Sequence, residues 1–244
     1  MAKIGPFVNS PTKSPRELLH TVLLSKGRVE ALTDGIFAIA MTLLVLELKV
    51  PDLPRSVPSH EILRRLGEEG PVFLSFFFSF VYCGLLWLFH HLAMHFFRHM
   101  QVALVWLNLL FLMSISILPF SCALLGRFMN NRAVLEIYFG NLFLAALLLL
   151  LQWMFARKRK LLNEDDPQAA QAMGLRLTVF PVALAAGMLG ALYKPAAGFY
   201  AMILVLLALR VWHKRQRRCA RAHIHFNRPR FHPGQSRALL SPDL

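Results

Sequence analysis

The feature that most limits how this chain can fold is a long run without charged side chains. Residues Pro71–Phe97 contain no Asp, Glu, Lys or Arg, and the same is true of Gln101–Leu125. A helix of about 20 mostly apolar residues spans the hydrocarbon core of a bilayer. Composition agrees, because 56% of the 244 residues are hydrophobic and 16% are charged, against roughly 45–50% and 25% in soluble domains. We therefore predict an all-α, polytopic membrane protein.

Six apolar segments are long enough to be transmembrane helices. They are Val29–Leu48, Pro71–Phe97, Gln101–Leu125, Ile137–Ala156, Leu177–Tyr193 and Pro195–Trp212. The Pro-rich stretch after the first span leads into Glu61–Gly70, which indicates a short amphipathic or irregular connection. Asn163–Pro167 is typical of a polar turn and a helix start. The predicted organisation is a cytoplasmic segment 1–27, a six-helix domain 28–213 and a basic cytoplasmic tail 214–244.

The basic residues indicate the orientation of the chain. There are 27 Lys and Arg against 13 Asp and Glu, and most of the cations lie near the termini and in the loops after even-numbered spans. The positive-inside rule then places both termini in the cytoplasm. The surplus favours contact with anionic membrane lipids, and nucleic acid is not an expected partner. Cys83, Cys122 and Cys219 are too scattered to indicate a disulfide framework or a zinc knuckle.

The first span is unusual because it contains Asp34 inside the helical pattern. An ionisable residue in a span is costly and normally faces protein or a water-filled path. Candidate partners for its carboxylate are Arg28, Trp87, His90, His91 and Asn108. A role in holding helices together is favoured for Asp34 over direct contact with an ion, because structural networks of this kind are common.

A second feature of this span is a stripe formed by Gly35, Ile39, Thr42 and Leu46, which recur at i, i+4, i+7 and i+11. Glu47 lies just beyond its outer end. Periodicity leaves two interpretations open. The stripe packs against neighbouring helices or lipid, or symmetry-related copies form rings around a pore. Hydrophobic rings can gate by dewetting, and hydroxyl groups can coordinate a partly dehydrated cation.

Four motifs, in register across three helices, resemble the transmembrane protein 175 family, which comprises the lysosomal potassium channel of animals and its bacterial relatives. Arg28-x-x-x-Leu32-Thr33-Asp34 is similar to the family's R-x-x-x-F-S-D signature, with Leu in place of Phe and Thr in place of Ser. The other three are Trp87-x-x-His90-His91, Leu107-Asn108-Leu109 and Leu118-Pro119-Phe120.

The resemblance implies a homotetrameric potassium channel in a bacterial plasma membrane, with K⁺ as the permeant ion, no cofactor and no T-V-G-Y-G filter. The first helices would line the pore. By position, Ile39 matches the family's hydrophobic constriction, Thr42 a hydroxyl layer linked to selectivity, and Leu46 a second apolar ring; Glu47 would lie at the outer mouth. The expected interhelical network consists of Arg28, Thr33, Asp34, Trp87, His91 and Asn108.

Other functions are less well supported by the residues. His91 and His95 lie one helical turn apart, but no acidic or cysteine partner follows, so we expect no metal site. We expect His91 to form a hydrogen bond within the bundle, and His95 and His99 to lie near the cytoplasmic surface. The chain lacks the G-x-S-x-G and H-E-x-x-H motifs, so an enzyme is not expected. The alternatives are an ion-coupled carrier, in which Asp34 and histidines relay protons, and a membrane scaffold.

Overall fold

The structure is a computed structural model that describes residues 25–54, 56–163 and 167–193, together with residues 197, 198, 200, 203, 204, 207, 208 and 211. Its elements are α2 (Lys26–Leu44), the 3-10 helix η1 (Val45–Glu47), α3 (Ser59–Glu68), α4 (Gly70–His95), α5 (Val102–Arg127), α6 (Arg132–Lys158) and α7 (Pro167–Tyr193). Five of these helices, α2 extended by η1 and α4 to α7, are long and apolar enough to cross a membrane. The prediction of an all-α membrane fold is confirmed.

The first five predicted spans are present, with shifted ends. α6 begins at Arg132 because Asn131 caps it: the Asn131 carboxamide oxygen accepts hydrogen bonds from the backbone N–H groups of Ala133 and Val134, at 2.9 and 3.4 Å. α7 begins at Pro167, the helix start that the polar turn predicted, and therefore well before Leu177.

Other predicted segments lie wholly or mostly outside the described residues. They are the predicted sixth span Pro195–Trp212, residues 1–24 of the N-terminal segment and the tail 214–244. The chain divides into two compact units, Met1–Met202 and Ile203–Leu244, and all the named helices belong to the first. In the second unit the described residues are helical.

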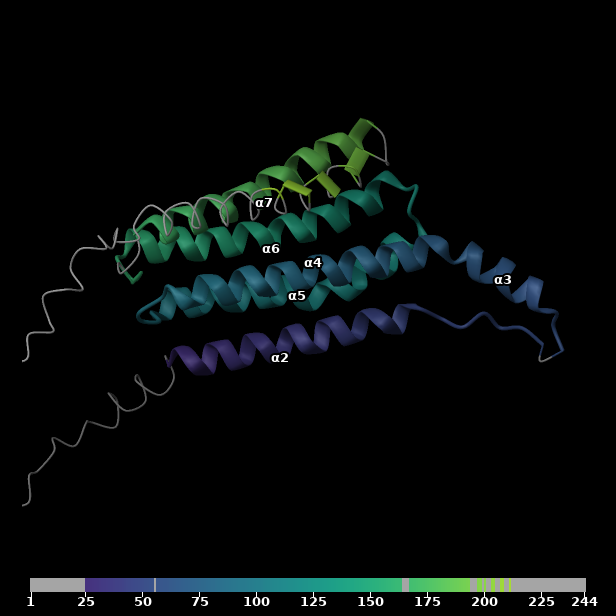
Figure 1. The fold of residues 1–244 in the computed structure, drawn as a ribbon, viewed down its shortest axis with the longest axis horizontal. Helices are drawn as coiled ribbons and strands as arrows, with labels where there is room; N and C mark the ends of the chain where they lie inside the picture. Colours follow the sequence, from purple (N-terminus) through teal and green to yellow (C-terminus); the bar gives the residue numbers. More distant parts are fainter. Residues whose placement is uncertain are drawn as a thin grey trace, which may run out of the picture. The chain divides into compact units, whose positions relative to one another are not determined.

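The long helices of the first unit pack side by side in an order that places α2 at an edge (Figure 1). α4 and α5 contact each other, and α2 packs on both. α6 packs against α5, and α7 packs against α6. The principal neighbours of α2 among the described elements are therefore α4 and α5. One face of α2 lies against these two helices, and many residues on its other side are exposed among the described elements.

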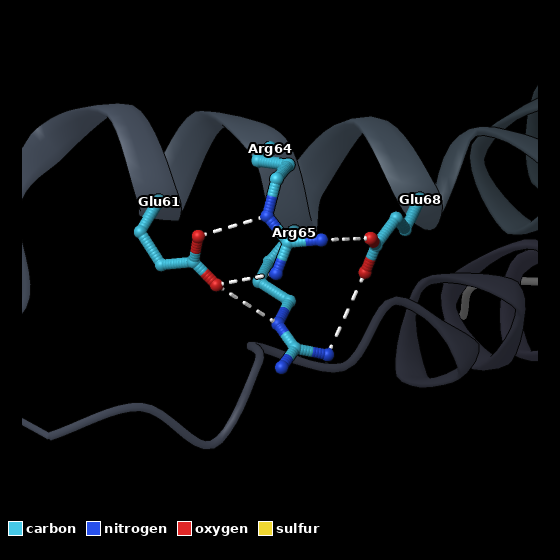
Figure 2. Close-up of polar contacts among 4 residues, drawn as sticks. All are labelled: Glu61, Arg64, Arg65 and Glu68. Atoms are coloured by element: carbon cyan, nitrogen blue, oxygen red, sulfur yellow. Dashed lines mark hydrogen bonds and ion pairs between the residues drawn. The ribbon is translucent and has the colours of Figure 1, made fainter.

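α3 confirms the amphipathic alternative for the connection before α4. On one side, Arg64 and Arg65 lie between Glu61 and Glu68, and the Arg64 Nε donates to Glu61 at 2.8 Å (Figure 2). This hydrogen bond holds the pKa of the Glu61 carboxyl below its usual value. The apolar residues Ile62, Leu63 and Leu66 lie on the other side and are exposed.

Candidate pore-lining helix and its polar anchor

One face of α2 is buried within the subunit. Its residues recur at the helical spacing, and they are Val29, Thr33, Phe37, Ala40 and Leu44. Phe37 is 1% exposed, and its ring lies 5.8 Å, centroid to centroid, from the ring of Phe111 in α5. This face fixes how α2 is rotated about its axis, because five successive positions along it are covered by α4 and α5.

The face of α2 that carries the predicted stripe is exposed in the subunit. Ile39 is 58% exposed and Leu46 is 66% exposed, and Thr42 is exposed as well. A Cβ atom added at Gly35 would meet no described atom beyond its own helical turn within 4 Å. The stripe is therefore a continuous surface along the length of a membrane-spanning helix, and none of the described elements covers it.

The Thr42 hydroxyl on this face has a defined orientation. It donates within the helix, 3.0 Å from the carbonyl oxygen of Ala38 and 2.8 Å from that of Ile39. A hydroxyl group has one hydrogen to donate and two lone pairs with which to accept. Because the hydrogen is used by the backbone, the oxygen remains on the exposed face as an acceptor, which is the group that a cation requires.

A buried chain of hydrogen bonds joins α2 to α5 and α4. The Thr33 hydroxyl donates to the Val29 carbonyl at 2.8 Å, and the Asn108 amide nitrogen donates to the Thr33 hydroxyl oxygen at 3.1 Å. The Asn108 carboxamide oxygen lies 2.8 Å from His90 Nε2. Because Asn108 uses its amide for Thr33, its oxygen accepts, and His90 Nε2 is the donor. Thr33 and Asn108 are each 1% exposed and His90 is 3% exposed, so the chain is sealed inside the subunit.

A second polar contact links α2 and α4 at the border of the exposed surface. The Trp87 indole N–H donates to the Asp34 carboxylate at 2.8 Å. The Trp87 ring stacks on the His91 ring, with centroids 5.6 Å apart and an interplanar angle of 20°. Asp34 and Trp87 also border an apolar groove of about 680 Å³ between the two helices, whose other lining residues are Phe37, Ala38, Met41, Gly84 and Leu88. Asp34 thus has a hydrogen-bond partner on a neighbouring helix.

The structure brings together most of the residues assigned to the network, and it adds one. His90 occupies the buried position, whereas His91 is exposed and stacks on Trp87. His90 is buried because it lies on the same stripe of α4 as the buried residues Cys83 and Leu86, and this stripe is the pattern that could have identified it. That stripe could not be recognised, because α4 is apolar on all sides and periodicity does not separate its faces.

The remaining predicted residues lie at the periphery of the site. Arg28 is exposed in the first turn of α2, and no carboxylate of the described residues lies within ion-pair distance of it. Leu32, which stands where the family signature has Phe, is 48% exposed. Glu47 is half-buried in η1. His95 and His99 are exposed at and just beyond the end of α4.

The site residues lie within a segment that matches a known family. The family model for the endosomal/lysosomal potassium channel TMEM175 matches residues 28–119, which extend from α2 into α5. A Streptomyces collinus protein named as a potassium channel is 32% identical over 161 residues, which cover 63% of this chain and 76% of that protein. The class of protein is therefore a multi-pass helical ion channel, and not an enzyme.

Two further proteins extend the comparison. A crystal structure of a Chamaesiphon minutus homologue of the lysosomal potassium-selective channel TMEM175 superposes with a TM-score of 0.67 at 27% identity. It covers 76% of this chain and 97% of that one. The Gallus gallus endosomal/lysosomal proton channel TMEM175 is 41% identical over 111 residues, 43% of this chain but 22% of that protein. The chain belongs to the TMEM175 family.

Proposed function

We propose that this protein is the subunit of a potassium channel in which four copies surround a pore lined by the exposed face of α2. The observation that carries the proposal is the contrast within α2, where one face is buried against α4 and α5 and the opposite face has no described neighbour. The names of its relatives support potassium as the permeant ion.

Each residue of the stripe has a chemical role in this pore. Rings of Ile39 and Leu46 form two dry constrictions, because closely spaced hydrophobic side chains exclude water. A ring of Thr42 oxygens lies between them and offers acceptors to a partly dehydrated cation. Glu47, beyond the stripe, raises the local cation concentration at the outer mouth.

The interhelical contacts hold this face toward the pore. The Thr33–Asn108–His90 chain and the Asp34–Trp87 hydrogen bond both join α2 to helices behind it, and His91 supports the Trp87 ring by stacking. Arg28 lies at the start of the same helix. Hydrogen bonds between helices add to packing in a membrane, where apolar surfaces gain little from leaving lipid.

The orientation follows from the distribution of Lys and Arg in the sequence. Both termini lie in the cytoplasm, and the protein is a multi-pass component of a bacterial plasma membrane. The segment 1–27 and the basic tail 214–244 flank the channel domain 28–213 on the cytoplasmic side, where the tail contacts anionic lipid.

The test is ion flux through the purified full-length protein in liposomes, with K⁺ and Na⁺ compared under equal gradients. We expect rapid flux that prefers K⁺, a reduced preference in Thr42→Ala, and increased leak of other cations in Ile39→Ala. Thr178→Ala is the matched control, because the Thr178 hydroxyl also donates to its own helix, to Gly174 at 2.9 Å, but lies on α7. An unchanged permeability ratio in Thr42→Ala would remove the hydroxyl ring from the filter.

A second candidate function is suggested by the vertebrate relatives, which are named as proton channels. A proton gradient across the same liposomes separates the two. Ion-coupled carriage is a further alternative; it predicts slow, saturable flux that depends on a second ion, whereas a channel predicts unitary currents. If lipid covers the stripe instead, well-folded protein will show neither flux nor current.

A further inference from the structure

A cavity unrelated to the α2 face lies where α6 ends and α7 begins. Its volume is about 480 Å³, and its polar lining consists of Trp153, Arg157, Lys160, Asn163 and Gln171. Cavities of this size are typical of small-molecule sites. Because α6 and α7 are both long enough to cross a membrane, the turn between them lies at the level of the lipid headgroups.

The turn that carries the cavity is fixed by backbone contacts with the loop after α4. The Arg98 N–H donates to the Leu161 carbonyl at 2.8 Å, and the Asn163 N–H donates to the Phe96 carbonyl at 2.7 Å. The Arg98 side chain also donates to the Asn163 carboxamide oxygen, at 3.2 Å. Between α6 and these contacts, Lys160 adopts φ 56°, a left-handed conformation that non-glycine residues rarely adopt. The surrounding contacts therefore hold Lys160 at the cavity despite an unfavourable backbone conformation.

The chemistry of the lining favours an anion with several acceptor oxygens. Neither Arg157 nor Lys160 has a carboxylate within ion-pair distance among the residues that the structure describes. A guanidinium and an ammonium together are groups that bind phosphate oxygens.

We propose that this cavity binds the phosphate group of an anionic phospholipid. The headgroup layer supplies such phosphates at this depth, and the basic run from Arg157 to Lys160 lies on the side of the membrane that the charge distribution assigns to the cytoplasm. Arg157 and Lys160 bind the phosphate oxygens, and the apolar lining of the cavity receives the start of the acyl chains. This inference does not depend on whether the channel conducts.

The test uses thermal unfolding of the purified full-length protein in detergent. The added lipid is phosphatidylglycerol, phosphatidylcholine is the neutral comparison, and inorganic phosphate is a third arm. The cavity variant is Arg157→Gln with Lys160→Gln. The control is Lys158→Gln with Arg159→Gln, which removes the same charge from residues that do not line the cavity; the Arg159 guanidinium instead lies over the Phe155 ring, 5.7 Å from its centroid.

We expect phosphatidylglycerol to raise the unfolding temperature of the wild type and the control. In the cavity variant the half-saturating concentration should rise about tenfold or more, because the two cations that line the cavity and bind the phosphate oxygens are lost, whereas the control keeps both. Equal weakening in both variants would show diffuse attraction and overturn the proposal. A wild type that does not prefer phosphatidylglycerol would overturn it as well. If inorganic phosphate alone reproduces the effect, the lipid assignment is wrong. Lys160→Gln alone carries the same comparison if the double variant does not fold.

Discussion

The two faces of α2 differ in what they contact. The buried face contacts other helices of the subunit, through the packing of Phe37 on Phe111 and through the hydrogen bonds from Thr33 through Asn108 to His90. The exposed face, with Ile39, Thr42 and Leu46, is not covered by any described element of the subunit. The packing of the buried face alone determines how α2 is rotated about its axis. The residue types on the exposed face are therefore not constrained by packing within the subunit and can serve another function.

Asp34 lies where these two faces meet, and its position explains why a charged residue is tolerated within a span. Its carboxylate accepts a hydrogen bond from Trp87 and is exposed within the subunit, beside the groove between α2 and α4. A carboxylate in this position joins two helices, and the hydrogen bond from Trp87 offsets part of the cost of a charge within a span.

The largest difference between the faces should be in stability. Phe37→Ala removes a fully buried ring, and we expect the free energy of unfolding to fall by about 3–5 kcal/mol. Ile39→Ala removes an exposed side chain and should change it by about 0.5 kcal/mol or less. Denaturant unfolding of the two purified variants measures both values. Similar losses would mean that Ile39 is packed as tightly as Phe37 and does not face a pore.

The next effect concerns the buried polar chain. Asn108→Leu keeps the size of the side chain but breaks the contacts with both Thr33 and His90, and we expect a loss of about 1–2 kcal/mol. Ser116→Ala on the same helix is the control, because the Ser116 hydroxyl donates only to its own helix, to Leu112 at 2.9 Å. Thermal unfolding of both variants tests the difference. If they are equally stable, packing alone holds α2 in place.

A smaller effect is expected at the border between the faces. Asp34→Asn keeps an acceptor oxygen for Trp87 but removes the charge, so we expect the hydrogen bond to weaken by about 0.5–1.5 kcal/mol. The fraction of assembled tetramer should fall more than the flux per tetramer. Light scattering after size exclusion measures the first quantity, and liposome flux measures the second. A normal tetramer with altered ion affinity would instead show that Asp34 contacts the permeating ion.

The smallest effect on stability is expected in α3. Its charged side chains are exposed to solvent, whereas the Thr33–Asn108–His90 chain that joins α2 to α5 and α4 is buried. The pKa of Glu61 is lowered in the folded state, so the stability that its pairing with Arg64 contributes is present above the unfolded pKa and is lost as the pH falls. Between about pH 6 and pH 3, the hydrogen-exchange protection factors in α3, which are corrected for the intrinsic pH dependence of exchange, should fall before those in α2 do. Glu61→Gln should abolish this pH dependence in α3. Persistence of the pH dependence in that variant would show that Glu61 is not its cause.

Much of the fold could be predicted from the sequence. Charged residues mark the ends of apolar runs because they are costly in the bilayer, so the positions of the first five spans could be predicted. The polar turn before Pro167 likewise predicted a helix start. The partner of Asp34 was among the candidates because few polar side chains occur in the spans. The stripe of Gly35, Ile39, Thr42 and Leu46 followed from helical period alone.

Only the tertiary structure decided which face of each helix is buried. Lipid is as apolar as a protein core, so buried and lipid-facing positions carry the same residue types, and α4 shows no polar side that would distinguish His90 from His91. The cavity at Arg157 and Lys160 could not be predicted for a different reason: it depends on a contact between two loops that are distant in the sequence. The sequence by itself determined the positions of the five described membrane-capable helices, because burying a charge in lipid is costly at any rotation of a helix. The rotation of α2 was decided by packing against α4 and α5, because only those contacts distinguish one apolar face from another.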